Sequence, residues 1–137
     1  MKKSSAQLTK ALKAYAIIKL LIKKPIIYGS IAATFYTNKK LPMNDIDILV
    51  RKRDLELLAA KLPRAKYNAI FDTVHVKIAG IKVELDARER WAPKNLSTTS
   101  KLVNNKIVTI TTKKSLIWFY KKGTKASHKR ILKILRT

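Results

Sequence analysis

Residues 45–50 read Asp-Ile-Asp-Ile-Leu-Val, and this alternation of carboxylate and apolar side chains constrains the fold more than any other stretch of the chain. Successive side chains of a β-strand point to opposite faces, so a strand here places Asp45 and Asp47 on one face and Ile46 and Ile48 on the other. Two carboxylates held this close repel one another unless a proton or a cation lies between them. We therefore expect a core strand with a cation site, and Mg²⁺ suits it because Mg²⁺ binds carboxylate and phosphate oxygens.

A Gly-Ser pair precedes this strand. Residues 26–28 are apolar and short, as in a buried strand, and residues 32–36 can continue as a helix. Gly29 and Ser30 then stand where backbone N–H groups at a helix start can bind phosphate. Taken singly, a Gly-Ser pair is more typical of a plain turn and an Asp-x-Asp of a solvated surface. Their order and spacing together favour a site for phosphate and metal.

A third carboxylate can be placed from the stretch 73–86, which alternates polar and apolar residues on both sides of Ala79-Gly80. This pattern is typical of a β-hairpin with a two-residue turn. Such a turn predicts three polar cross-strand pairs: Lys77 with Lys82, His75 with Glu84, and Thr73 with Asp86. The polar face then offers Glu84 or Asp86 as the third carboxylate, and the spacing leaves both open, with a weak preference for Asp86. The alternative is an amphipathic hairpin with a solvated face.

Together these residues resemble the signature of the DNA polymerase β-like nucleotidyltransferase superfamily. That signature is an apolar residue, Gly, then Gly or Ser, a gap, an Asp-apolar-Asp-apolar strand and a third Asp on a later strand. The chain matches it with Tyr28-Gly29-Ser30, with residues 45–48 and with Asp86. Val108-Thr109-Ile110 and the basic helices after it look like those of minimal prokaryotic and archaeal nucleotidyltransferases, which include toxin–antitoxin and abortive-infection members. The resemblance covers most of residues 25–136.

The resemblance implies a reaction and a role for each residue. The implied reaction is the Mg²⁺-dependent transfer of a nucleoside monophosphate from an NTP to a hydroxyl, with release of pyrophosphate. The implied catalytic and metal-binding residues, for two Mg²⁺ ions or Mn²⁺ in their place, are Asp45, Asp47 and Asp86, with Glu84 as the alternative. The implied nucleotide-binding residues are Gly29, Ser30, Lys40 and Lys121. The chain departs from the family in a long gap before Asp45 and in lacking the basic residue that often directly precedes the Asp pair.

The charge of the chain bears on the acceptor. There are 31 Lys and Arg against 8 Asp and Glu, a formal net charge of +23, and all the acids lie between Asp45 and Glu89. Such a surface attracts phosphate backbones in a salt-dependent manner. We therefore expect a nucleic-acid acceptor, RNA such as a tRNA 3′ end more than DNA. The alternative is a basic nucleic-acid-binding antitoxin or accessory protein with a weakly active or inactive nucleotidyltransferase fold; a small-molecule acceptor ranks third.

The remaining sequence predicts an α+β fold, a mixed β-sheet flanked by helices, in one domain of residues 1–137. Apolar residues at helical spacing predict an N-terminal helix within 1–24. Residues 25–111 then form the palm sheet core, and residues 112–137 form basic C-terminal helices that break at Gly123. Within the palm we expect a helix that Asp54 caps and a polar loop over residues 93–100.

The chain contains no cysteine, and lysines interrupt every apolar run before it is long enough to span a membrane. We therefore expect a cytoplasmic protein with no membrane partner, and the sequence leaves a homo-oligomer or a partner subunit open. His75 is either a base or the cross-strand partner of Glu84. The aromatic residues that can stack on a base, although those in helices more often fill a core, are Trp91, Trp118, Phe119 and Tyr120.

Overall fold

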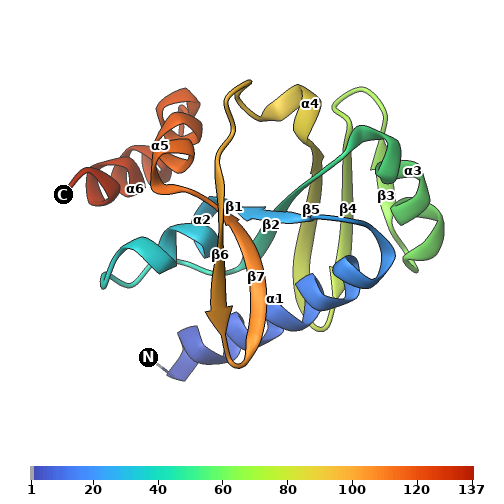
Figure 1. The fold of residues 1–137 in the computed structure, drawn as a ribbon, viewed down its shortest axis with the longest axis horizontal. Coiled ribbons are helices and arrows are strands. Elements are labelled where there is room, and N and C mark those ends of the chain that lie inside the picture. Colours follow the sequence, from blue (N-terminus) through green and yellow to red (C-terminus); the bar gives the residue numbers. More distant parts are fainter. Residues whose placement is uncertain (1) are drawn as a thin grey trace.

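A computed structural model describes residues 2–137 of the chain, and within them it contains a seven-stranded mixed sheet and six α-helices, an α+β fold as the sequence predicts (Figure 1). The strands are β1 (Ile26–Tyr28), β2 (Asp45–Val50), β3 (Lys66–Asn68), β4 (Thr73–Ile78), β5 (Ile81–Ala87), β6 (Thr98–Val103) and β7 (Lys106–Thr111). The helices are α1 (Lys2–Leu21), α2 (Gly29–Ala33), α3 (Lys52–Lys61), α4 (Arg88–Trp91), α5 (Lys113–Lys122) and α6 (Ala126–Arg136), and a 3₁₀ turn, Thr34–Tyr36, extends α2.

The strand order is β3-β4-β5-β2-β1-β7-β6, which places β2 at the centre of the sheet. β2 runs parallel to β5 and antiparallel to β1, and β1 runs parallel to β7. The β4–β5 hairpin has the predicted register: Thr73 pairs with Asp86, His75 with Glu84 and Lys77 with Lys82. Both residues of its turn, Ala79 and Gly80, have positive φ, as a two-residue hairpin turn of the primed type requires.

The two faces of the central strands differ in character. On one face Ile46, Ile48 and Leu85 are fully buried, and α1 and α3 pack against β2, β4 and β5 there. Tyr15 ties α1 to the sheet, because its hydroxyl accepts from the backbone N–H of Thr109 in β7 at 3.2 Å and donates to the backbone oxygen of Pro25, just before β1, at 2.8 Å. The opposite face carries Asp45 and Asp47, so the strand alternation sends the apolar side chains to the core and the carboxylates away from α1.

Several element boundaries differ from the sequence-based expectations. The expected 1–24 helix, whose residue 1 lies outside the described residues, ends at Leu21. The helix that Asp54 was expected to cap begins earlier, with Arg51 as its N-cap, and Asp54 instead accepts a hydrogen bond from Arg51 Nε at 3.0 Å in the first turn. The polar loop over 93–100 is shorter than expected, because β6 begins at Thr98.

The short strand β3 pairs with β4 at one edge of the sheet, where the sequence predicted no strand. Its three residues are all exposed, so they lack the apolar alternation that predicts a strand. Among the described residues, no helix has the length and hydropathy needed to cross a membrane.

Candidate active site

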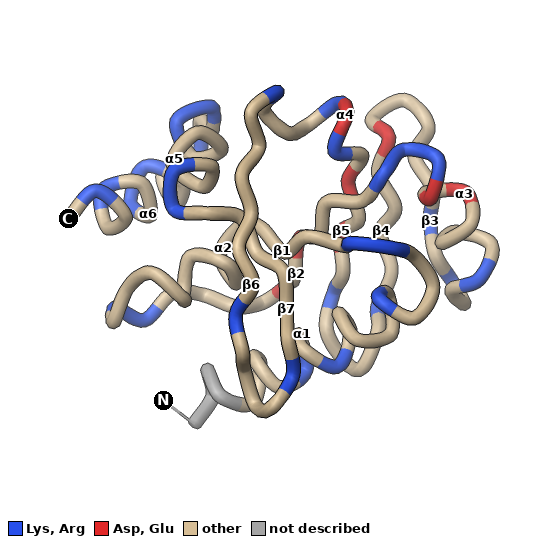
Figure 2. Tube along the Cα trace, in the orientation of Figure 1, with Lys and Arg blue, Asp and Glu red and all other residues tan. Residues whose placement is uncertain are grey.

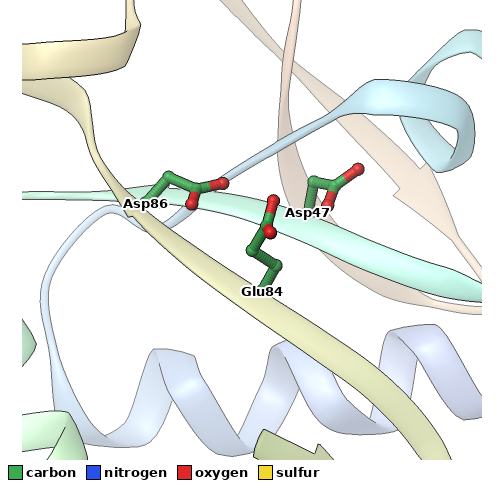
Figure 3. A group of neighbouring side chains, drawn as sticks. All are labelled: Asp47, Glu84 and Asp86. Carbon is green, nitrogen blue, oxygen red and sulfur yellow. The ribbon is translucent and has the colours of Figure 1, made fainter. Parts of the chain in front are cut away.

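Three carboxylates converge on the open face of β2 and β5. Asp47 of β2 stands directly beside Glu84 of β5 in the parallel register, and Asp86 follows two residues later on the same face. One oxygen from each of the three lies within 4.8 Å of the others, and Figure 3 shows all three side chains rising from the sheet on the side away from α1. The structure therefore brings both candidates for the third carboxylate, Glu84 and Asp86, next to Asp47.

Asp45 occupies a different position. It is exposed at the start of β2, in register with Lys82, and is not part of the group of three. Its charge nevertheless contributes to raising the pKa of Asp47. Asp45 therefore lies at the mouth of the site, whereas Asp47, Glu84 and Asp86 form its floor.

The carboxylates strongly disfavour one another's ionised form. Burial first, and then the charges of Glu84, Asp45 and Asp86, raise the pKa of Asp47 well above its usual range. Burial and Glu84 raise the pKa of Asp86 to about 8. A divalent cation between these oxygens would remove the repulsion, and a donor set made only of carboxylate oxygens suits a hard cation such as Mg²⁺ or Mn²⁺. The residues present therefore fit the metal that the resemblance implies.

Positive side chains do not neutralise this group. Asp54 pairs with Arg51, Asp72 lies 3.9 Å from Lys52 Nζ and 3.6 Å from an Arg90 nitrogen, and Glu84 lies 3.4 Å from His75. Among the side chains of residues 6–137, the structure shows no ion pair to Asp45, Asp47 or Asp86. In a chain of net charge +23, carboxylates at the centre of the sheet without a Lys or Arg partner among the described side chains form a group that could hold a metal ion.

Tyr28, which the sequence analysis did not assign to the site, completes the floor. It is directly opposite Asp47 in the antiparallel β1–β2 pair, so both side chains share a face. Its hydroxyl donates to Asp86 Oδ2, and its ring lies against Phe119 of α5, with 4.7 Å between ring centroids. That hydrogen bond lowers the pKa of Asp86, opposing the effects of burial and Glu84. Tyr28 therefore both orients Asp86 and connects the site to α5.

Gly29 approaches the carboxylates closely. Its φ is +76°, a conformation that side chains disfavour. A Cβ added there would lie 3.2 Å from Asp47 Cγ and closer still to Asp47 Oδ2. Both the backbone conformation and the space therefore require glycine, and the Gly-Ser pair lies directly against Asp47.

A cleft of about 480 Å³ opens over this arrangement. Gly29 and Ser30 line it together with Asp45, Asp47 and Glu84 on the sheet side. The start of α6 also lines the cleft, with three residues that the sequence analysis did not connect to the site: Lys125, Ser127 and His128. A lysine and a serine thus line the same cleft as the Gly-Ser pair.

The two lysines predicted to bind nucleotide lie beside neighbouring hollows. Lys40 lines a hollow that shares Pro42 and Asn44 with the cleft but contains none of the carboxylates. Lys121 lines another hollow, between α5 and the segment near Pro93. Among the lysines of the described residues, it is Lys125 that lines the cleft itself.

Aromatic residues near the site are divided between core and surface. Tyr120 is buried, and burial together with the charges of Asp47 and Asp45 raises its pKa. Phe119 lies between Tyr28 and Trp118, edge-on to the latter. Trp91, in contrast, is 38% exposed at the end of α4.

No family model and no curated protein sequence matches the chain. Solved structures do match. The lincosamide antibiotic adenylyltransferase LnuA, in its lincomycin-bound form, aligns with a TM-score of 0.61 at 11% identity, over 91% of this chain and 95% of that one. An antigenic nucleotidyltransferase-like protein from Paracoccidioides brasiliensis aligns with a TM-score of 0.61 at 12% identity, over 94% of this chain and 74% of that one.

The chain has the nucleotidyltransferase fold. The expectation drawn from residues 28–30, 45–48 and 86 is thereby confirmed for the architecture. At identities this low the likeness concerns the fold alone, so the activity must be argued from the site.

Proposed function

We propose that this protein is a divalent-metal-dependent nucleotidyltransferase that moves a nucleoside monophosphate from an NTP to a hydroxyl of a nucleic acid, with an RNA end preferred to DNA. One observation carries the proposal: carboxylates from two adjacent strands, without Lys or Arg partners among the described residues, share a cleft with a Gly-Ser pair. This combination suits a nucleotide triphosphate and the cation that accompanies it.

Each side of the cleft has a distinct task in this proposal. Gly29 and Ser30 bind the β and γ phosphates from the sheet side, and Lys125 and Ser127 contact the same phosphates from α6. Asp45, Asp47 and Asp86 hold the metal, with Glu84 close enough to replace or assist Asp86. A divalent cation bound there lowers the pKa of the attacking hydroxyl and stabilises the charge on the phosphate oxygens. Lys40 and Lys121 contribute from outside the cleft.

The reaction forms one bond and breaks one. The acceptor hydroxyl oxygen forms a bond to the α-phosphorus while the bond from that phosphorus to the bridging oxygen breaks, and pyrophosphate leaves with the electron pair. The hydroxyl proton passes to the Asp86 carboxylate and from there to solvent. Tyr28 holds Asp86 in place through its hydroxyl.

The charge favours a polyanionic acceptor over a small molecule. Figure 2 shows the acidic positions on β2, β5, α3, α4 and the loop before β4, whereas α5, α6 and the β6–β7 hairpin carry basic positions and no acidic ones. The LnuA structure contains lincomycin, a small molecule, but a net charge of +23 suits a phosphate backbone better than an antibiotic.

A second function is favoured by the same charge. A protein with this surface can bind RNA tightly without transferring nucleotide, as an antitoxin or accessory subunit would. The carboxylates discriminate between the two, because a module that only binds RNA gains nothing from acids inside a basic surface.

The test is to incubate the protein with Mg²⁺ or Mn²⁺, each labelled NTP in turn, and RNA, primed DNA, a lincosamide or no acceptor. Label on RNA, lost with EDTA and with Asp47→Asn, supports the proposal. Asp54→Asn is the matched control, since Asp54 pairs with Arg51 away from the cleft. Label on the lincosamide alone refutes the nucleic-acid acceptor. Salt-sensitive RNA binding with no transfer, or transfer by Asp47→Asn at the wild-type rate, refutes the enzyme.

A further inference from the structure

A second hollow, of about 380 Å³, lies beside the cleft. Tyr28 and Glu84 line both, so these two side chains form the wall between them. Asp86 lines only the second hollow, whereas Asp45, Gly29 and Ser30 line only the cleft. The carboxylate group is therefore reached from two sides.

The different linings of the two hollows suit the two oxygens of a displacement at phosphorus, the attacking one and the leaving one. The attacking oxygen and the leaving oxygen lie on opposite sides of the phosphorus in an in-line reaction. If the pyrophosphate lies against Gly29 and Ser30, the attacking hydroxyl approaches from the far side of the carboxylates. The hollow lined by Asp86 occupies that far side.

Besides Tyr28, two exposed aromatic side chains from different elements line this hollow. Phe71, in the loop between β3 and β4, is 50% exposed, and Trp91, at the end of α4, is 38% exposed. The Trp91 indole N–H donates to the backbone oxygen of Phe71 at 2.8 Å, so the loop and the helix are joined where the rings lie. Exposed aromatic faces that the backbone already fixes suit stacking with a planar group.

Arg90 lies against both of these aromatic rings. Its guanidinium carbon lies 5.7 Å from the centre of the Phe71 ring and 5.1 Å from the centre of the Trp91 ring. It also donates to the backbone oxygen of Ile70 and lies 3.6 Å from Asp72. The rings are thus held in one arrangement with a positive charge beside them, which favours an anionic ligand with a planar group.

The same face of the sheet carries unpaired positive charge. Lys77 and Lys82 are directly opposite one another across the β4–β5 hairpin, and Lys66 of β3 is opposite His75. All three lysines are exposed. Like charges in opposed cross-strand positions destabilise a sheet, and phosphate groups lying across them would remove that cost.

We propose that the hollow binds the unpaired terminal nucleotide of a single-stranded polynucleotide acceptor, with its base against Phe71 and Trp91 and its hydroxyl toward Asp86. The backbone phosphates preceding it lie over Lys66, Lys77 and Lys82. The assignment of the hydroxyl as the attacking group rests on the proposed function, whereas binding of the nucleotide does not. Binding and transfer are therefore tested separately.

The binding test uses Trp91 as its own probe. The chain has two tryptophans, so Trp118→Phe leaves Trp91 as the single indole emitter. This variant is titrated in EDTA, without NTP, with a short single-stranded RNA, the same sequence in DNA, and an RNA whose terminal nucleotide lacks its base. We expect the intact strand to quench Trp91, and the strand without the terminal base to bind about tenfold more weakly. The RNA and DNA arms decide which sugar is preferred.

Substitutions at Phe71 separate stacking from packing. Phe71→Leu keeps apolar bulk but removes the ring, and we expect it to lower affinity for the intact strand about tenfold. Phe71→Tyr keeps the ring and retains the affinity. Leu102→Ala is the matched control, because Leu102 is 72% exposed on β6 at the opposite edge of the sheet. In the transfer assay, Phe71→Leu raises the KM for the acceptor and leaves the KM for NTP unchanged.

Three results of the binding experiments would overturn the proposal. They are equal binding of strands with and without the terminal base, wild-type affinity in Phe71→Leu, and Trp91 emission that changes with protein concentration instead of polynucleotide. The last would make this surface a contact between copies of the chain. Quenching of Trp91 by the intact strand in a protein without transfer activity would sink the proposed function and leave the binding site standing. Transfer with unaltered kinetics in Phe71→Leu would support the proposed function and refute the binding site.

Discussion

Gly29→Ala tests the contact between the Gly-Ser pair and the carboxylates. The new Cβ would lie 3.2 Å from Asp47 Cγ and closer to Oδ2, so the carboxylate must leave its present position beside Glu84. The positive φ adds about 1–2 kcal/mol of backbone cost for any residue with a Cβ, and the overlap adds about 1–3 kcal/mol. We therefore expect Gly29→Ala to lower the free energy of unfolding by about 2–5 kcal/mol.

Gly80→Ala provides the matched control. Gly80 has φ of +81°, but a Cβ there would have nothing nearer than the Lys10 side chain at 3.7 Å. Gly80→Ala therefore carries the backbone cost of about 1–2 kcal/mol without the overlap. The difference between the two variants in urea denaturation, measured in EDTA, isolates the effect of moving Asp47.

The functional loss should exceed the loss of stability. Displacing one ligand lowers the affinity for Mn²⁺, measured by calorimetry, by about tenfold or more, and a misplaced site lowers the transfer rate about 100-fold. Gly80→Ala should retain both. Wild-type Mn²⁺ affinity in Gly29→Ala, with a stability equal to that of Gly80→Ala, would refute the close approach of Gly29 to the metal site.

Other predictions concern charge. In EDTA, the folded protein keeps the Asp86 proton up to about pH 8, whereas the unfolded chain releases it near the ordinary value of 3.8. The free energy of unfolding therefore falls as the pH rises between these values, by up to about 1.4 kcal/mol per pH unit for this proton. Asp86→Asn should remove that part of the slope. A slope that is the same in Asp86→Asn as in the wild type would contradict the raised pKa of Asp86. Tyr28→Phe removes a hydrogen bond that lowers the pKa of Asp86, so an NMR titration in EDTA should show this pKa raised further, not lowered. Lys125→Ala should raise the KM for NTP about tenfold, and more than Lys121→Ala does. A larger effect of Lys121→Ala would favour Lys121, the residue predicted from the sequence, as the nucleotide-binding lysine.

The central strands could be predicted because their signals are local. The alternation in residues 45–50 and 73–86 fixes which side chains share a face, and a two-residue turn at Ala79-Gly80 fixes the pairing of Thr73 with Asp86. Neither signal predicts which strand pairs with β5 on the side away from β4. The parallel pairing of β2 with β5 is what sets Asp47 beside Glu84, and it explains why the sequence left the choice between Glu84 and Asp86 open.

The parts that could not be predicted depend on tertiary packing. Lys125 and Ser127 reach the cleft because α6 packs against α5 and α2, and no spacing in the sequence connects them to the carboxylates. Lys121, chosen by analogy, lies on the helix before. A signal did exist for Tyr28: as the last residue of a strand that pairs with β2, it had to fall near one of the two aspartates.

The proposed chemistry and the proposed choice of acceptor reside in different kinds of backbone. Asp47, Glu84 and Asp86 project from the central strands, where a shift of one residue would turn every side chain to the opposite face. Phe71 and Trp91 come from a loop and a one-turn helix beyond the ends of those strands, where replacement leaves the ladder intact. Acceptor preference can therefore be altered by substituting the loop before β4 and the helix α4, while the carboxylates keep their places. A library confined to these two segments is the natural starting point for redirecting the protein to a new acceptor.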